Sequence, residues 1–326
     1  MNKEAYLCLS AMLRAREGKM LTADRAARML EAQTFADCAK LLGDCGYEDM
    51  GSLNAAGVDA ALSARRAALF REIENLVPDK ALVELFRLKY DYHNAKTVLK
   101  AEAVGTDPLR LMSVSGRVAP EKLKSAWDEE RMSELPKVLG AAMVEAGSTL
   151  ARTANPQLAD FDLDKACFAE MKAIADGLDN ALISGYVRLL IDAANLKSVV
   201  RTARMHKSAD FLSDVLIRGA TDVDRLSGAD ADALIAVFAH TPLEKAAAAG
   251  GEAMSGGSMT VFERACDNAV NDYIRGAKLL SYGPEVVVAY LAAAENEITA
   301  ARMILTGSLA GVDADTIRER LRDLYA

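Results

Sequence analysis

One short phrase occurs three times in this chain at a nearly constant spacing. The copies read YDYHNAK, IDAANLK and AAENEIT, at residues 90–96, 191–197 and 293–299. Aligned on Asn94, Asn195 and Glu297, they lie 101 and 102 residues apart. So regular a period is typical of one module used three times in tandem. It predicts three related modules, which can close around an axis and hold something between them.

The segments before each phrase repeat as well. Strand-like alternation is nearly absent and helical spacing dominates, so we expect an all-α fold. Each module begins with a helix, continues through a turn and a short helix, and ends on a long helix that carries the phrase. The expected helices are at 6–16, 120–131 and 229–239, at 34–42, 133–142 and 241–249, and at 78–104, 178–206 and 284–306. The predicted modules are residues 1–105, 106–208 and 209–326.

Local signals support several of these boundaries. Thr22 and Thr34 stand where N-caps would stand, and Thr34 has Asp37 three residues on, as in a capping box. Four prolines fall where helices would begin, at positions 78, 120, 242 and 284. Residues 147–160 and the glycine-rich 250–258 read as flexible connections. A last helix, at 313–324, is expected to pack back on the third module.

Composition narrows the class of protein. Of 326 residues, 51% are hydrophobic and only 6% aromatic, which favours helices packed closely through small side chains. The net charge is −8, and no Lys/Arg cluster forms the basic face that a nucleic-acid binder needs. Five scattered cysteines without a CxxC pair indicate reduced thiols. The first residues lack the layout of a signal peptide, and the best apolar run, 286–294, is too short to span a bilayer.

The polar residues of the phrase have two possible roles. Asp91 and Asn94 are three residues apart and share one helix face, as Asp192 and Asn195 do. Asp and Asn each cost about 0.6 kcal/mol in a helix interior relative to Ala. The cost is recovered if they hydrogen-bond a neighbouring helix end or a nearby Lys or Arg, since buried polar groups need partners. The other interpretation is that they face a partner protein. We favour the first.

Basic residues come after the Asp and Asn positions on the same helices. They are Lys96, Lys100, Lys197 and Arg201. They could form a solvated face, act as counter-charges to Asp91 and Asp192, or form a basic lip for an acidic partner. The sequence alone does not separate these roles.

No catalytic or cofactor motif stands out. The chain lacks GxxxxGK[ST], GxGxxG and GxSxG, and its three histidines are isolated. The acidic run at Asp160, Asp162 and Asp164 fails as a calcium loop because Lys165 and Met171 occupy the positions that need Gly and Glu. An acidic helix start is the better interpretation. We therefore expect no active site, no metal and no cofactor.

Taken together, the motifs resemble the C subunit of bacterial and archaeal V/A-type rotary ATPases, whose eukaryotic counterpart is the d subunit of the vacuolar proton pump. The resemblance begins at 6–16 with 20–22, continues through 34–42 and runs to 311–321. Its most telling phrase is 88–96. The matching positions are Tyr90, Asp91, Asn94 and Lys96, then Asp192, Asn195, Lys197 and Arg201, then Glu295, Glu297 and Arg302.

The resemblance implies an all-α fold with three lobes about a pseudo-threefold axis, enclosing a funnel. It implies a peripheral subunit on the cytoplasmic side of the membrane, seated on the rotor ring. The central-stalk subunits and the ring would be its partners, and it would couple the two without an active site. The third phrase departs from the pattern, because Ala294 stands at the Asp position. An asymmetric stalk foot and simple divergence explain that departure equally well.

Two other functions remain in competition. The chain could be a free-standing helical scaffold for a different partner. It could also be an all-α enzyme that uses the Asp and Asn positions as acid–base or metal groups, which would need paired carboxylates in a cleft. We rank the enzyme last. Whether the pumped ion is a proton or sodium, and whether ATP is made or spent, are also left open.

Overall fold

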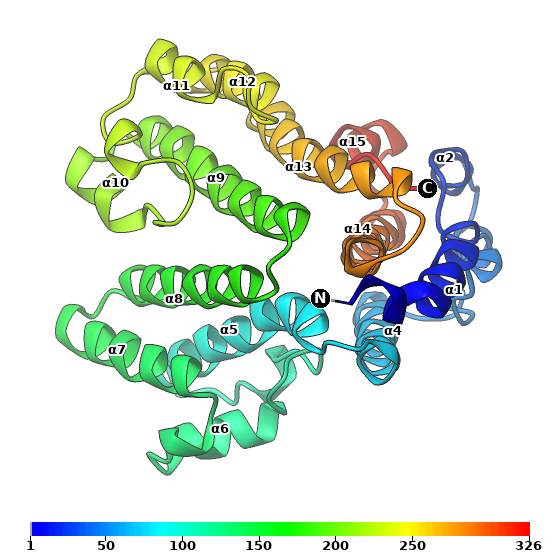
Figure 1. Ribbon diagram of the computed structural model, residues 1–326, viewed down its shortest axis with the longest axis horizontal. Coiled ribbons are helices and arrows are strands. Elements are labelled where there is room, and N and C mark those ends of the chain that lie inside the picture. Colours follow the sequence, from blue (N-terminus) through cyan, green and yellow to red (C-terminus); the bar gives the residue numbers. More distant parts are fainter. Residues whose placement is uncertain (1) are drawn as a thin grey trace. The chain divides into compact units, whose positions relative to one another are not determined.

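The computed structural model describes residues 2–326 (Figure 1). Within that range, all regular structure is helical, with fifteen α-helices, six short 3-10 turns and no strand. The predicted all-α class is therefore confirmed. No helix among the described residues combines the length and the apolar character required to cross a bilayer.

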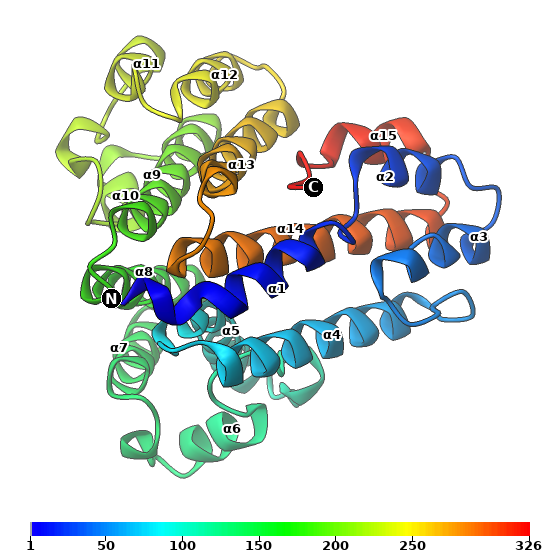
Figure 2. The same ribbon diagram turned by 45° about the vertical axis from the view of Figure 1, so that its right-hand side comes forward.

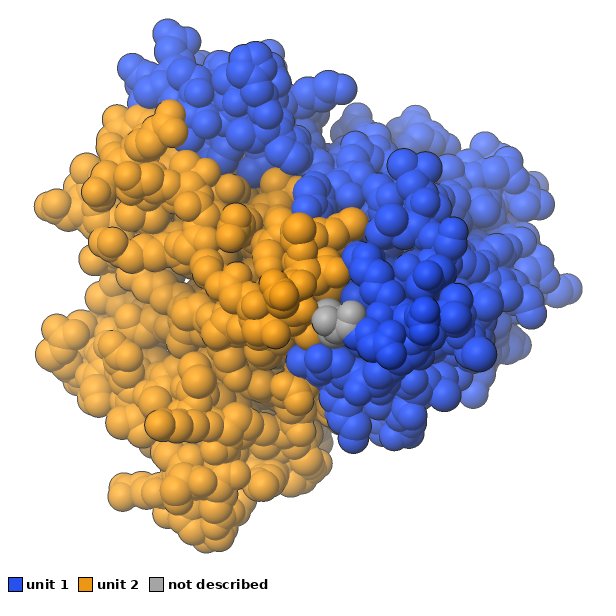
Figure 3. Space-filling model, viewed as in Figure 1, with its two compact units in different colours: residues 1–83, 230–326 blue, residues 84–229 orange. Residues whose placement is uncertain are grey.

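The chain divides into two compact units (Figure 3). One unit joins the residues up to Val83 with Asp230–Ala326, and the other is Glu84–Ala229. The first contains α1 (Leu7–Glu17), α2 (Ala23–Leu30), α3 (Phe35–Lys40), α4 (Ala55–Leu76), α11 (Ala231–Phe238), α12 (Glu244–Met254), α13 (Met259–Arg275), α14 (Pro284–Leu309) and α15 (Ala314–Arg320). The second contains nearly all of α5 (Ala81–Val104), with α6 (Pro120–Asp128), α7 (Lys137–Thr153), α8 (Pro156–Gly177), α9 (Ala181–Arg204) and α10 (Ala209–Val215).

In the first unit, α14 is the central helix. It packs against α1, α2, α3, α4, α13 and α15, and Figure 2 shows it running alongside α1 and α4. Of its 26 residues 16 are buried, so it is enclosed on most sides rather than on one stripe. Its alanines and valines permit this close approach from several directions. This unit thus joins the last long helix of the chain to the first helices.

The second half of α14 lies in a continuous core. Ile298, Ile304 and Leu305 pack with Met29 of α2 and Leu42, which lies just after α3. Fully burying a Leu or Ile side chain contributes roughly 1.5–3 kcal/mol. The expected last helix is present but shorter than predicted, since α15 covers Ala314–Arg320, and it packs against α13 and α14.

In the second unit, α7 packs along α8, and α8 packs along α9. The interior side chains of α9 include Ile183, Val187, Ile191 and Val200. The residues between α9 and α11 form α10, which packs on α8 and α9, and a segment that contains the 3-10 turn Val223–Arg225.

The three long helices lie where the repeat predicts them, within three residues at each end. The N-caps are also confirmed. Thr22 accepts a hydrogen bond from the backbone nitrogen of Arg25 at 3.2 Å, and Thr34 accepts one from Asp37 at 3.1 Å. Pro120 and Pro284 are the first residues of α6 and α14. Proline suits this position because its missing N–H would have no helical partner there.

Two predicted flexible connections are wrong. Residues 147–160 lie mostly in α7 and α8, which are separated only by Ala154 in a left-handed conformation and the N-cap Asn155. Much of 250–258 belongs to the end of α12. The short helix predicted at 133–142 is a 3-10 turn, Met132–Glu134, followed by the longer α7. Gly147 lies inside α7, and Gly250 and Gly251 lie inside α12, so these glycines do not break their helices.

Candidate functional site

Asn94 on α5 is fully buried and binds the backbone of Ser113 through both ends of its amide. Its Nδ2 donates to the Ser113 carbonyl oxygen at 2.8 Å, and its Oδ1 accepts from the Ser113 nitrogen at 2.7 Å. The amide side chain therefore makes the two hydrogen bonds that a neighbouring backbone peptide group would otherwise make with this segment, which has no regular structure. This contact fixes the chain between η3 (Leu109–Leu111) and α6 to the middle of α5.

Asp91, one turn earlier, is also fully buried. Its Oδ1 accepts from the backbone nitrogen of Val118 at 3.1 Å, and its Oδ2 accepts from Nε of Arg117 at 2.7 Å. Nη1 of Arg117 also donates to Oε1 of Glu170 on α8 at 2.8 Å, and the hydroxyl of Tyr92 donates to the same carboxylate. Burial raises the pKa of Asp91, and the Arg117 guanidinium opposes that shift.

The same arrangement occurs on α9. Nδ2 of Asn195 donates to the carbonyl oxygen of Ile217 at 2.8 Å, and the Ile217 nitrogen donates to Oδ1 at 2.8 Å. Oδ1 of Asp192 accepts from the backbone nitrogen of Thr221 at 2.9 Å. The Asn partners lie 19 and 22 residues further along the chain, and the Asp partners 27 and 29. Both copies thus hold the segment that comes after their own helix.

The third copy holds the beginning of the chain. Oε2 of Glu297 on α14 accepts from the backbone nitrogen of Leu21 at 2.6 Å, and Oε1 accepts from the Tyr47 hydroxyl at 2.7 Å. Ala294, at the Asp position, is buried and has no polar side chain to offer. We call the contacts Asn94–Ser113, Asn195–Ile217 and Glu297–Leu21 the polar staples. Burial raises the pKa of Glu297, against the opposing effect of its two hydrogen bonds.

The charged residues near the phrase also form ion pairs within their unit. Nζ of Lys96 lies 2.6 Å from Oδ1 of Asp164, and Lys100 pairs with Asp160 one turn away. The interpretation of these aspartates as a helix start is wrong, because α8 begins at Pro156. They lie one to two turns inside α8, where they face lysines of α5.

The same holds in the third copy. Glu295 pairs with Nε of Arg66 on α4 at 2.8 Å, and Nε of Arg302 lies 2.7 Å from Asp59. Lys89 lies over the ring of the half-buried Tyr90 at 5.0 Å. Lys197 is half-buried and Arg201 is exposed. A role of these predicted residues in contacts with a partner protein stays a prediction.

Sequence reasoning missed the groups to which the phrase binds. Ser113, Ile217 and Leu21 take part through their backbone atoms, so their side chains carry no signal. Arg117 and Tyr47 do have polar side chains, but they lie 26 and 250 residues from their partners Asp91 and Glu297. Only the three-dimensional fold brings these pairs together.

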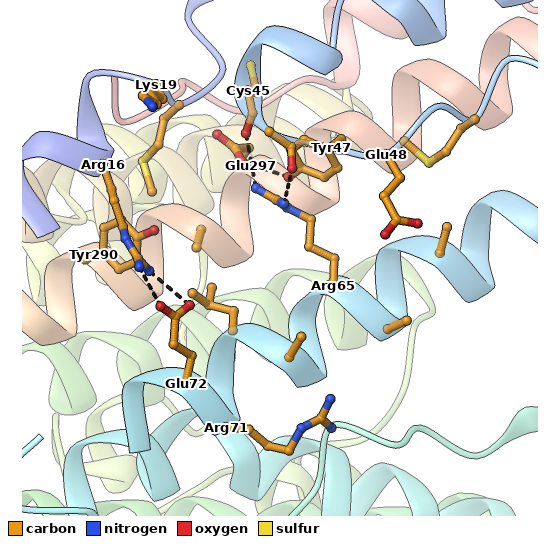
Figure 4. A pocket seen from close by; sticks show the side chains of 18 residues that line it. Arg16, Lys19, Cys45, Tyr47, Glu48, Arg65, Arg71, Glu72, Tyr290 and Glu297 are labelled. Atoms are coloured by element: carbon orange, nitrogen blue, oxygen red, sulfur yellow. Dashed lines mark hydrogen bonds and ion pairs between the residues drawn. The ribbon is translucent and has the colours of Figure 1, made fainter. Parts of the chain in front are cut away.

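A half-open hollow lies next to the third staple, between α1, α4, α14 and the segment 45–50 (Figure 4). Its volume is about 620 Å³, within the range of ligand pockets. Tyr47 and Glu297 form one wall, and Arg65 reaches over the Tyr47 ring at 3.8 Å. Arg16 of α1 and Glu72 of α4 form an ion pair across the hollow, 3.0 Å from Nη1 to Oε2. Among residues 2–326, no group of three His, Cys, Asp or Glu side chains is placed to hold a metal.

Comparisons with known proteins decide the family. A family model described as ATP synthase (C/AC39) subunit matches residues 9–320. The chain belongs to this family. Its members are non-catalytic subunits of rotary ATPases, so the predicted family and the prediction that the chain is no enzyme by itself are both confirmed.

Three relatives show how far the similarity extends. The V-type sodium ATPase C subunit of Enterococcus hirae is 22% identical over 98% of this chain and 99% of its own length. The A-type ATP synthase C subunit of Methanocaldococcus jannaschii is 24% identical over 98% of this chain and 86% of its own length. The V-type ATP synthase C subunit of Thermus thermophilus is 27% identical over 68% of this chain and 69% of its own length. As a member of this C/AC39 family, the chain is a peripheral subunit of a membrane-bound complex.

Proposed function

We propose that this chain is the spacer and socket of a V/A-type rotary ATPase, on the cytoplasmic side of the membrane. In this role it joins the central-stalk subunits to the membrane rotor ring and couples rotation of one to the other. The family match over residues 9–320 supports this role, as do relatives named as C subunits that align with 98% of the chain.

The polar staples are the structural observation that carries the proposal. A spacer that transmits torque must resist bending where its long helices meet their neighbours. Each long helix here is fixed by a buried side chain bonded to the backbone of a neighbouring segment. Breaking such a contact leaves a buried polar group unsatisfied, which costs about 1–3 kcal/mol. The staples therefore oppose local bending, which would prevent rotation of one partner from being transmitted fully to the other.

We further propose that the three modules, 1–105, 106–208 and 209–326, are arranged with pseudo-threefold symmetry around a central funnel. The support is that α5 and α9 carry the same pair of contacts and that α14 carries a variant of it. The variant, with Glu297 in place of Asn and Ala294 in place of Asp, would make one lobe differ from the others. An asymmetric stalk foot would fit such a socket.

Binding to the cognate stalk tests the role. The purified chain is mixed with the central-stalk subunits of the same organism, and the mass of the complex is measured by light scattering after gel filtration. We expect a stable one-to-one complex, which then binds the detergent-solubilised rotor ring. A helical protein of similar size and charge, which should bind neither, is the control. If the chain elutes alone from both mixtures, the proposal is wrong.

A further inference from the structure

The hollow beside the third staple has an apolar floor. Ala64 and Ala68 of α4 line it with exposed side chains, and the buried Ala294 of α14 lies beneath. Met20 and Leu69 extend the same surface. Because the side chains of Ala64 and Ala68 are small, they leave space above α4 that larger residues would fill. The floor can therefore receive apolar groups from outside.

The rim of the hollow is cationic although the whole chain carries a net charge of −8. Four basic residues line it, namely Arg16, Lys19, Arg65 and Arg71. Arg16 is paired with Glu72, and Arg65 donates to the carbonyl oxygens of Cys45 and Gly46. Lys19 and Arg71 are exposed and pair with no described residue. Figure 4 shows Lys19 beside the end of α1 and Arg71 on α4, on different sides of the hollow.

The carboxylates of the hollow do not cancel this charge. Glu72 is engaged by Arg16, and Glu297 is buried against Tyr47 and Leu21. Burial also raises the pKa of Glu297, which favours its neutral form. Glu48 is the remaining carboxylate of the lining, and the two unpaired cations Lys19 and Arg71 outnumber it. A ligand with several negative groups is therefore attracted to Lys19 and Arg71.

The length of the hollow indicates the size of that ligand. Its lining on α4 runs from Ala61 to Glu72, and eleven helical steps of 1.5 Å span about 16 Å. An extended peptide advances about 3.3 Å per residue, so about five residues cover that distance. A single phosphate or carboxylate would occupy only a small part of it.

We propose that this hollow binds an acidic peptide segment of a partner protein. The segment lies along α4, with carboxylates toward Lys19 and Arg71 and apolar side chains on Ala64 and Ala68. This site is additional to the socket role and does not depend on it, so a failed stalk-binding test would leave it intact.

The probe is a fluorescein-labelled seven-residue peptide in which Glu and Leu alternate, followed by fluorescence anisotropy at low salt. We expect saturable binding that weakens at least tenfold when every Glu of the peptide is replaced by Gln. Lys19→Gln with Arg71→Gln should weaken binding about tenfold, since each exposed charge pair contributes up to about a factor of five. The control is Lys40→Gln with Lys122→Gln, which removes two exposed charges elsewhere and should leave binding unchanged.

The floor is tested with Ala68→Phe, which fills the hollow, against Ala60→Phe, which places the same ring on an exposed position of α4 outside it. Only the first should abolish binding, with the unfolding temperature of both variants within a few degrees of the parent. A photo-crosslinking group on the peptide should label residues 61–72. Equal binding of the Gln peptide, insensitivity to the rim variants, or no binding at millimolar peptide would each overturn the proposal. Displacement by millimolar phosphate or succinate would assign the site to small anions instead and would also overturn it.

Discussion

Glu297 and Leu21 are 276 residues apart in the chain, yet Oε2 of the first accepts a hydrogen bond from the backbone nitrogen of the second at 2.6 Å. The long helices α5 and α9 bind segments that come after them, at Ser113 and Ile217. For the last long helix, α14, the corresponding segment is the turn between α1 and α2. If the modules close on themselves, this turn takes the place of the segment after the third module, and the Glu297–Leu21 staple joins the two halves of one unit.

Replacing the amide staples should destabilise the chain. Asn94→Ala and Asn195→Ala each leave a backbone N–H and a backbone C=O without their partner, and we expect losses of about 1–3 kcal/mol in the free energy of unfolding. Urea denaturation at pH 7 measures this. Asn271→Ala, which removes one surface hydrogen bond to Asp323, should cost less than about 0.5 kcal/mol. Equal losses at all three positions would show that the staples contribute no more to the free energy of unfolding than a surface hydrogen bond does.

A methyl group at Gly116 should disrupt the Asp91 site. A Cβ built there overlaps Oδ1 of Asp91, the atom that accepts from Val118. Gly116→Ala must therefore displace a buried carboxylate, and we expect it to cost about 2 kcal/mol or more. Gly177→Ala, where nothing lies within 4 Å of the added carbon, is the control. It should be neutral or slightly stabilising, and thermal unfolding of both variants gives the comparison.

Arg117 should be among the most sensitive residues of the second unit. It bridges Asp91 and Glu170, and removing it leaves a fully buried carboxylate without a cation. Arg117→Met should cost about 3–5 kcal/mol, as when one partner of a buried ion pair is lost. The double variant with Asp91→Asn should recover part of this loss, because the uncompensated charge is then absent. A double-mutant cycle that shows simple additivity would contradict the ion-pair interpretation.

The third staple should depend on pH. Burial raises the pKa of Glu297 above its ordinary value of 4.5 in the folded chain. The folded state then holds this proton more tightly than the unfolded state. The resulting stabilisation is fully present below about pH 4.5 and is lost as the pH rises through the folded-state pKa. The stability of the parent relative to Glu297→Gln should therefore fall over the pH range above about 4.5. A difference that is constant or that grows over this range would contradict the assignment.

Much of the fold can be predicted from the sequence because the signals that begin and end helices are local. Thr34 with Asp37 gives a cap, and Pro120 and Pro284 open helices, from interactions within one turn. An acidic residue does mark a helix start at Asp230 and Asp313, which are N-caps that accept from the backbone nitrogen three residues further on. The same interpretation is wrong at Asp160, because its helix begins four residues earlier and a distant lysine occupies its carboxylate.

The candidate site is less accessible from sequence because its contacts are distant and use backbone atoms. The identical spacing of Asp and Asn on α5 and α9 indicates that both pairs have the same surroundings. It does not reveal that the amide binds Ser113 or Ile217, or that Glu297 reaches back to Leu21. The hollow beside that staple is lined by Ala68 of α4 and Ala294 of α14, which lie far apart in the chain, so no local sequence pattern predicts it.

Coupling of ATP hydrolysis to ion transport tests the central claim most directly. The complex is assembled in vesicles with and without this chain, and ATP-driven ion uptake is measured together with ATP hydrolysis. Our account predicts that the complex without the chain still hydrolyses ATP but takes up almost no ions, and that adding the chain restores uptake. Equal uptake per ATP in both preparations would contradict a role in joining the stalk to the ring.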